Sequence, residues 1–344
     1  MLFAQKTKGY FVDFGDNVVT LARTSSSVAP LTIEQVIEVP AGNDAALEDA
    51  IRQIQPKKSP SGYLHATVGV YPLKRLVRRA ALELKRVKEP AYLAEVASTQ
   101  FRIEAEKYSL AVLNSADGSD FDVNRAAQKE VLFCGLSNDD IVETQDRLLA
   151  HGIYPERLEL GTVGALGALV SFLAAAKSKT PTLVLEIGMD STHSFIVTGE
   201  GIETSRPIPQ GLDSMIPVVQ KELNLKDEES ARKLFFSNTF DFTGMGPALI
   251  RKLLKELQSS IGFYEVQTGQ SIGQVCCLLL PSKLAWLEGS IAAQLGVGQL
   301  GFEFAPWLQV RGITVPETGL TVDARLLGLL GLMAHYHAVL PEKK

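Results

Sequence analysis

The sequence has few cysteines, a small net charge and no long apolar run, and each shortage excludes a class of protein. Its three cysteines are an odd number without metal or disulfide spacing, so Cys134, Cys276 and Cys277 are expected to be buried, reduced thiols. A net charge of −5 argues against attraction of the whole protein to nucleic acid. Residues 160–176 are uncharged, but at 17 residues with three glycines they fall short of the ~20 apolar residues that a spanning helix needs.

Motifs of common catalytic and metal sites are also absent. The sequence has no Gly-x-Ser-x-Gly, no zinc-ligand spacing and no lysine-bearing P-loop. His335 and His337 lie two apart, which does not align side chains on one helix face, so we expect no metal site. Residues 1–10 carry Lys6 and Lys8 but no apolar segment before them. We therefore expect no signal peptide and a cytoplasmic location.

What the sequence does have is an alternation of short apolar strands with helical segments, which favours an α/β architecture. Residues 10–23 read as strand, turn and strand, because Gly15 and Asn17 suit a tight hairpin. Residues 181–211 repeat this opening. The first strand of each copy ends in an acid, an apolar residue and a glycine, at residues 13–15 and 186–188. The repeat indicates either a duplication that gives two similar lobes or the coincidence of a common triplet.

The basic segment at residues 73–88 fits more than one interpretation. Its apolar residues follow helical spacing, and seven of its residues are basic. Such a helix could contact anionic lipid or an acidic partner, or it could be a solvated face. Beyond it, residues 90–110 predict a helix, residues 131–135 a strand, and residues 138–151 a helix that ends at Gly152.

Residues 183–234 contain a series of short motifs in a characteristic order. They are Glu186-Ile187-Gly188, Ser191-Thr192, Ile208-Pro209-Gln210-Gly211-Leu212-Asp213 and Leu223-Asn224-Leu225. This order resembles the family of the type IV pilus assembly protein PilM, which belongs to the actin-like superfamily with sugar kinases, actin and FtsA. Residues 256–280 and 131–160 add weaker matches. The likeness therefore covers nearly the whole chain, and the order of the motifs supplies its specificity.

The resemblance implies a two-lobed actin-like fold, which is a duplicated ribonuclease-H-like α/β fold with a small α+β subdomain inserted in lobe one. It assigns residues 1–75 and 158–180 to the core of lobe one, and residues 76–157 to the inserted subdomain. Residues 181–215 and 272–344 would form the core of lobe two, and residues 216–271 its insert. It also favours a strand over residues 76–84, against the helical spacing, and a closing helix over residues 319–334 that returns to lobe one.

In this superfamily, two turns hold the phosphates of a nucleotide. The resemblance implies that the corresponding cleft here is vestigial and consists of Asp13, Gly15, Glu186, Gly188, Ser191, Thr192 and Gly211. Asp16 and Asp190 stand where small polar residues are expected, and two carboxylates repel a polyphosphate. Residues 278–281 are Leu-Leu-Leu-Pro where members have adenosine-binding glycines. We therefore expect no catalytic residue, no metal and no required cofactor; ATP with Mg²⁺ is the alternative.

The function that the resemblance implies is that of a cytoplasmic adaptor in a type IV pilus or a related secretion machine. Its partner would be the cytoplasmic tail of a PilN-like single-span inner-membrane protein, with no nucleic acid involved. The resemblance places the groove for this tail between the core of lobe one and the inserted subdomain. It would involve residues 75–89 and the helix at 91–108, and we expect Arg78 and Arg79 to border it. Two alternatives stay open: an active actin-like ATPase or kinase, and a cytoplasmic module like that of the type II secretion protein GspL.

Overall fold

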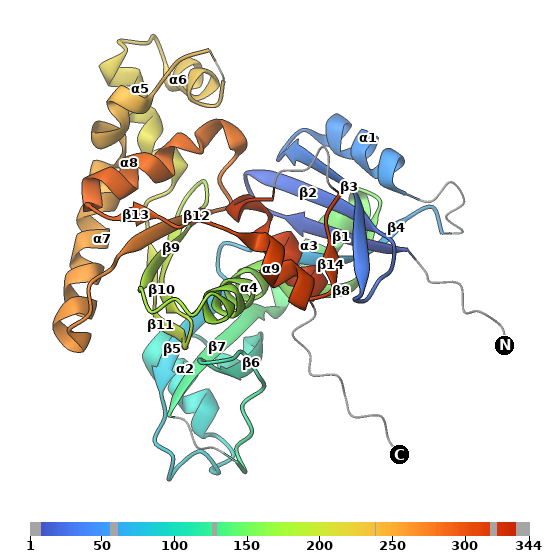
Figure 1. Ribbon diagram of the computed structural model, residues 1–344, viewed down its shortest axis with the longest axis vertical. Helices are drawn as coiled ribbons and strands as arrows, with labels where there is room; N and C mark the ends of the chain where they lie inside the picture. Colours follow the sequence, from blue (N-terminus) through green and yellow to red (C-terminus); the bar gives the residue numbers. More distant parts are fainter. Residues whose placement is uncertain (1–7, 56–60, 126–128, 238, 317–321, 335–344) are drawn as a thin grey trace.

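The computed structural model describes residues 8–55, 61–125, 129–237, 239–316 and 322–334, which form two lobes and a small subdomain (Figure 1). Lobe one contains a six-stranded sheet in the order β14-β3-β2-β1-β4-β8. Its strands are β1 (Gly9–Phe14), β2 (Val18–Thr24), β3 (Leu31–Pro40), β4 (Leu64–Val70), β8 (Ile153–Leu160) and β14 (Ile313–Thr314). The first three strands form an antiparallel meander, and β4 and β8 continue the sheet in parallel.

Two helices cover part of this sheet, and a side-chain oxygen caps each of them. Helix α1 (Asp44–Ile54) begins after Asn43, whose side chain accepts a hydrogen bond from the Ala46 N–H. Helix α3 (Asn138–Ala150) begins after Ser137, whose hydroxyl accepts from the Asp140 N–H. Both caps satisfy first-turn N–H groups that have no partner within the helix. The buried faces of α1 and α3 pack with the sheet into one apolar core.

Lobe two repeats the strand order of lobe one. Its five-stranded sheet runs β11-β10-β9-β12-β13, with a meander followed by two parallel strands. The strands are β9 (Thr182–Ile187), β10 (Thr192–Thr198), β11 (Gly201–Ile208), β12 (Gln274–Leu278) and β13 (Gly298–Gln299). The same order, meander first, confirms the duplication that the two acid-x-Gly triplets suggested. On β12, Cys276 and Cys277 are both buried and belong to different apolar clusters, so they face opposite sides of the strand.

The two lobes share a core rather than being joined by a flexible linker. Helices α4 (Gly161–Ala175) and α10 (Leu327–Ala334) pack together between the sheets (Figure 1). Glycines allow this close approach, because a Cβ on Gly331 would lie 2.4 Å from the carbonyl oxygen of Gly164. Buried side chains of both helices and both sheets form a single cluster. No helix among residues 8–334 that the structure describes is long and apolar enough to cross a membrane.

The inserted subdomain is a three-stranded antiparallel sheet, β5-β7-β6, with one helix. It comprises β5 (Leu76–Ala81), α2 (Tyr92–Phe101), β6 (Tyr108–Asn114) and β7 (Glu130–Ser137). The strand expected within residues 76–84 is therefore present. The helix predicted over residues 90–110 is wrong in its second half: α2 ends at Arg102, which adopts a left-handed conformation (φ 58°), and the chain continues into β6.

The remaining helices belong to lobe two. They are α5 (Ile216–Glu222), α6 (Glu228–Phe235), α7 (Gly246–Thr268), α8 (Trp286–Leu295) and α9 (Phe304–Val310). Helix α7 has 23 residues and lies along the outer side of the lobe in Figure 1. Its buried face packs with α8 and with the β9–β12 part of the sheet in the second large core.

The structure divides the chain at other points than the expected domain boundaries. Helix α3 and the first part of strand β8, which the range 76–157 assigned to the subdomain, pack and pair with lobe one. Strand β14 and helix α10, expected in lobe two with residues 272–344, contact β3 and α4 instead. The closing helix does return towards lobe one, but residues 319–321, 335–344 and 1–7 of these assignments lie outside the described part of the chain.

Candidate functional site

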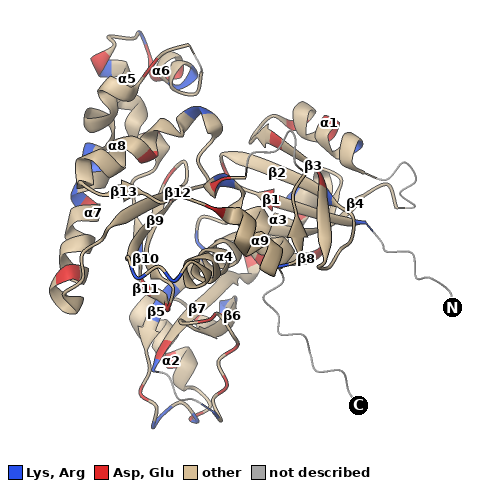
Figure 2. Ribbon diagram, in the orientation of Figure 1, with Lys and Arg blue, Asp and Glu red and all other residues tan. Residues whose placement is uncertain are grey.

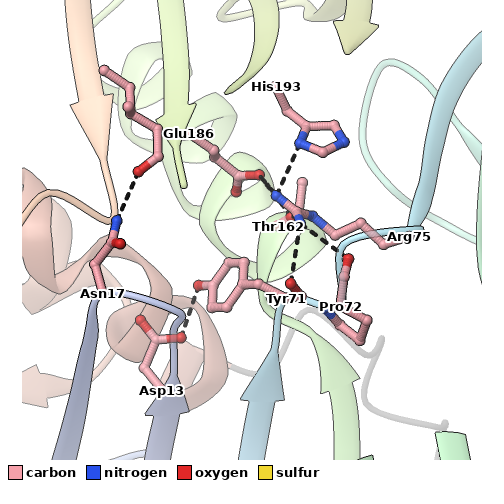
Figure 3. Close-up of polar contacts among 9 residues, drawn as sticks. Asp13, Asn17, Tyr71, Pro72, Arg75, Thr162, Glu186 and His193 are labelled. Carbon is pink, nitrogen blue, oxygen red and sulfur yellow. Dashed lines mark hydrogen bonds and ion pairs between the residues drawn. The ribbon is translucent and has the colours of Figure 1, made fainter. Parts of the chain in front are cut away.

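A buried hydrogen bond lies within lobe one, where the lobe faces Glu186 of lobe two. Tyr71, just after β4, donates its hydroxyl to the Asp13 carboxylate at 2.7 Å (Figure 3). Both side chains are nearly inaccessible. Burial raises the pKa of Asp13 to about 7, against the Tyr71 hydrogen bond, which lowers it. Gly328 of α10 packs directly against Asp13, and a Cβ at this position would lie only 2.3 Å from Asp13 Oδ2.

Arg75 links this corner of lobe one to lobe two. Its guanidinium donates to Glu186 Oε2 at 2.9 Å, and its Nε donates to the Thr162 hydroxyl at 2.8 Å. It also donates to the carbonyl oxygens of Tyr71 and Pro72. The exposed fractions of the Arg75 and Glu186 side chains are 5% and 0%, so the ion pair is buried. Thr162 in turn donates to Glu186 Oε2, so three segments far apart in sequence meet at one carboxylate.

His193 on β10 completes the network as a neutral base. Its Nδ1 lies 3.1 Å from the Arg75 guanidinium, which can only donate, so Nδ1 must accept (Figure 3). Burial, and then the positive charge of Arg75, lowers the pKa of His193 to about 3. The imidazole is thus uncharged at neutral pH. The other carboxylate oxygen of Glu186, Oε1, has no hydrogen-bond partner among the residues that the structure describes.

A second contact joins the two turns that were expected to hold phosphate. Asn17, in the β1–β2 hairpin, donates its amide to the carbonyl oxygens of Ile187 at 2.8 Å and Leu279 at 3.1 Å. Leu279 has a left-handed backbone (φ 62°), and its side chain lies beside Gly15, 3.6 Å from where a Cβ would be. The turn after β1 and the segments after β9 and β12 are therefore in direct contact.

These contacts test whether a nucleotide fits between the turns. A polyphosphate there would have to displace Asn17 from two carbonyl groups and Leu279 from the Gly15 turn. It would also meet the carboxylate of Asp16; burial raises the pKa of Asp16, the charges of Arg75 and Arg147 lower it, and the negative charge of Asp190 raises it by less. Oxygen atoms of phosphate and carboxylate repel one another without a cation between them. ATP with Mg²⁺ would therefore fit between the turns only if these contacts were broken.

The other residues expected at this cleft stabilise the turn of lobe two. The Gly188 N–H donates to the Ser191 carbonyl oxygen at 2.9 Å, and the Thr192 hydroxyl donates to the Gln210 carbonyl oxygen at 2.7 Å. Gly211 packs on the same turn, where a Cβ would lie 2.2 Å from the Met189 carbonyl oxygen. The structure thus places Gly188, Ser191, Thr192 and Gly211 in one turn of lobe two, with Gly15 facing it across Leu279 and with Asp13 near Glu186. Their expected role as nucleotide ligands stays a prediction.

Arg78 and Arg79, expected to border a partner groove, have partners within the protein. The Arg78 guanidinium stacks on the Phe101 ring, 5.5 Å from its centroid, and burial lowers its pKa. Arg79 donates to the Glu203 carbonyl oxygen at 2.6 Å and pairs with the Glu130 and Glu203 carboxylates. Both contacts hold the subdomain together or attach β5 to β11 of lobe two. Their role in partner binding stays untested.

The larger hollow of the subdomain lies on its other side, against lobe one. This groove has a cavity volume of about 840 Å³. Its walls are β6 and β7 on one side and β8, α3 and α4 on the other. Apolar residues dominate the lining, which includes Leu110, Ala111, Leu113, Cys134, Leu136, Ile141, Leu158, Leu160 and Val163. Polar groups of Gln145, Arg157 and Glu159 stand among them.

Two strands at this groove are the outermost strands of their sheets. Among the described strands, β8 pairs with β4 and β6 pairs with β7. One further residue pair, Leu113 with Asp120, forms an isolated antiparallel bridge on the outer side of β6. Within the described residues, no further strand covers β8 or the first half of β6. Outermost strands offer main-chain N–H and C=O groups to an extended peptide. The groove therefore combines apolar side chains with main-chain groups that suit such a peptide.

Comparison with known proteins supports the fold. Neither a family model nor a curated protein matches the sequence. A chain of the solved PilM-PilN type IV pilus biogenesis complex is 17% identical, over 95% of this chain and 98% of that one, with a TM-score of 0.66. The ethanolamine utilization protein EutJ from Carboxydothermus hydrogenoformans is 11% identical over 95% and 89%, with a TM-score of 0.43, too low to carry weight. The protein thus has the two-lobed actin-like fold, the same fold as this chain of the PilM-PilN complex.

Proposed function

We propose that this protein is an adaptor of a type IV pilus or related machine, which binds the cytoplasmic tail of a PilN-like single-span inner-membrane protein. The observation that carries the proposal is the apolar groove between the subdomain and lobe one, in a chain whose fold is that of a chain in the PilM-PilN complex. In this role the protein is cytoplasmic and reaches the inner face of the membrane through its partner. No catalytic step is needed.

The groove is suited to one extended segment rather than to a folded surface. Its outermost strands, β6 and β8, supply main-chain groups, and the apolar lining supplies pockets for alternate side chains of a strand. The groove lies between the subdomain and lobe one, and its lining includes none of residues 75–89 or 91–108. We therefore infer that the tail inserts beside β8 and contacts Ala111 and Leu158.

Substitution of Ala111 with arginine is expected to weaken tail binding by about tenfold or more. Ala111 is an exposed residue of β6 that lines the groove, so a long charged side chain fills apolar space without disturbing a core. Isothermal titration calorimetry with a synthetic peptide of the PilN-like tail encoded with this protein measures the dissociation constant. The matched control is Ala293→Arg, an equally exposed alanine on α8 of lobe two, which should bind as wild type does.

Equal binding by wild type, Ala111→Arg and Ala293→Arg would place the peptide outside this groove. Failure of the wild-type protein to bind the peptide at all would reject the adaptor proposal. The GspL-like alternative predicts the same fold but a different partner. Binding to a type II secretion protein rather than to the pilus tail would favour this alternative.

ATP with Mg²⁺ is expected not to raise the melting temperature, because Asn17 and Leu279 occupy the space between the turns. A ligand at 100 times its dissociation constant stabilises a native state by about 2.7 kcal/mol, so thermal denaturation in excess ATP detects even modest binding. The control is Gly188→Trp, which blocks the turn of lobe two. A saturable rise in melting temperature that Gly188→Trp removes would instead support the ATPase or kinase alternative.

A further inference from the structure

The solvent face of α7 carries unpaired cations at one end and exposed apolar side chains at the other. Lys252, Lys255, Gly262, Phe263 and Val266 recur at the spacing of one helix face and all are exposed or partly exposed. The exposed fractions of Phe263 and Val266 are 63% and 88%. Neither lysine forms an ion pair with the described residues. Figure 2 shows Lys and Arg gathered on one part of this outer helix.

Two further properties make this α7 face suitable for contact with another helix. Gly262 has no atom within 4 Å of the place where a Cβ would stand, so another backbone can approach closely there. The acid nearest the face, Glu256, accepts a hydrogen bond from Arg206 at 2.7 Å and its charge is therefore compensated. The cationic half of the face thus lacks a compensating anion within the described part of the chain.

Helix α3 of lobe one has a face of opposite charge. Asp139, Glu143 and Asp146 are exposed, and Val142 lies between them with an exposed fraction of 57%. These acids also form no ion pair with residues that the structure describes. Arg147 is the one cation of the helix, and its guanidinium lies over the Phe14 ring, 4.8 Å from the centroid. The acidic face of α3 is therefore open to a basic partner.

We propose that the α7 face of one copy of this protein binds the α3 face of a second copy. Each face holds three charges of one sign as well as exposed apolar side chains, because Arg251 adds to the two lysines of α7. The helices lie on different lobes (Figure 1), so the match cannot be satisfied within one chain. Opposite charges across an interface steer and orient association.

The two faces differ, so the contact joins copies head to tail. Such a heterologous interface leaves one α7 face and one α3 face free in each dimer and so extends into a ring or a filament. Helix α3 has 13 residues, about 20 Å, so the contact is small and belongs to the weak, transient class of interfaces. The adaptor would thereby place several partner tails side by side, although the proposal does not depend on tail binding.

Sedimentation velocity over a wide range of protein concentration tests this contact on the full chain. Wild type is expected to form species larger than a dimer at low salt. Lys252→Glu/Lys255→Glu and, separately, Glu143→Lys/Asp146→Lys should each weaken association by about tenfold or more. Salt should weaken the association of wild type and so reduce the difference in association between wild type and the two variants, because the screening length falls from ~10 Å at 0.1 M to ~3 Å at 1 M. Lys221→Glu/Lys226→Glu, exposed lysines near α5, is the matched control and should behave as wild type does.

The decisive sample is an equal mixture of the α7 variant with the α3 variant. Each variant keeps one intact face, so the mixture is expected to form dimers that cannot grow further, while each variant alone stays monomeric. Circular dichroism and melting temperature verify that both variants are folded. A wild type that remains monomeric at every concentration, or variants that associate as wild type does, would overturn the proposal. So would a mixture that shows no dimer.

Discussion

Replacing Arg75 with methionine is expected to lower the free energy of unfolding by about 3–5 kcal/mol, the usual cost of removing one partner of a buried ion pair. The variant leaves the Glu186 carboxylate buried and without a cation, and it leaves Thr162 Oγ1 and two carbonyl oxygens without their donor. Urea denaturation of the full chain measures the change. Because Arg75 joins the lobes, we also expect the variant to lose interlobe contacts before it unfolds globally.

The control for this variant is Arg206→Met. Arg206 pairs with Glu256 at 2.7 Å, but the side chains are 43% and 37% exposed, so the loss should stay within about 1 kcal/mol. A double variant, Arg75→Met/Glu186→Leu, should recover part of the loss, since it removes the uncompensated carboxylate. If Arg75→Met costs no more than Arg206→Met, the buried network does not hold the lobes together.

Asp13 is expected to make the protein less stable as the pH rises from about 4 to about 7. Its pKa is 3.8 in an ordinary setting and about 7 in the native state, mainly because burial disfavours the carboxylate. The native state therefore holds a proton that the unfolded chain releases, and stability falls with pH across that window. A shift of this size corresponds to roughly 4 kcal/mol. Asp13→Asn, which cannot ionise, should flatten this part of the pH profile.

Tyr71→Phe should change the pH profile in the direction opposite to Asp13→Asn. The Tyr71 hydroxyl donates to the carboxylate and lowers its pKa, so removing it should extend the window of declining stability to higher pH. Denaturation of wild type and the two variants between about pH 3 and pH 8, roughly one unit beyond each end of the window, separates the cases. Superimposable pH profiles of wild type and Asp13→Asn would show that burial does not raise the pKa of Asp13 in the native state.

The meanders that open both lobes follow from local signals, whereas one part of the subdomain does not. Gly15 and Asn17 mark the first hairpin, and the same pattern recurs after β9, so both meanders could be predicted. Strand β6 was missed because its apolar residues continue a stretch that reads as helix from residue 90. Helix α2 ends at Arg102, which adopts a left-handed conformation. Glycine or asparagine usually occupies this position at the end of a helix, so the sequence gives no signal for the helix end.

The residues of the cleft illustrate a different limit of the sequence. Asp13 and Glu186 could be found because each ends the first strand of a repeat. Arg75 could not be told from the other basic residues of segment 73–88, because its burial depends on Thr162 and Glu186, which tertiary folding brings to it. His193 was one of five scattered histidines until the sheet placed it beside Arg75. No sequence signal marked these two residues.

The expected groove between lobe one and the subdomain corresponds to a real hollow, but its lining differs from the basic segment that was expected to border it. Positive charge at Arg78 and Arg79 suggested a surface, but stacking on Phe101 and contacts with Glu203 use these side chains internally. The groove beside β8 arises from two sheet edges that come from different parts of the chain. Such a feature is set by the packing of the subdomain on lobe one and has no local pattern.

Hydrogen exchange of the full chain, with and without a peptide of the PilN-like tail, tests the proposed groove most directly. A tail that adds to an outermost strand must protect main-chain amides there. We predict slower exchange in residues 108–111 of β6 and 157–160 of β8, with little change in β5 at Arg78 and Arg79 or in the interlobe turns at Gly15 and Gly188. Protection of β5 or of the interlobe turns, with β6 and β8 unchanged, would contradict the proposed docking site.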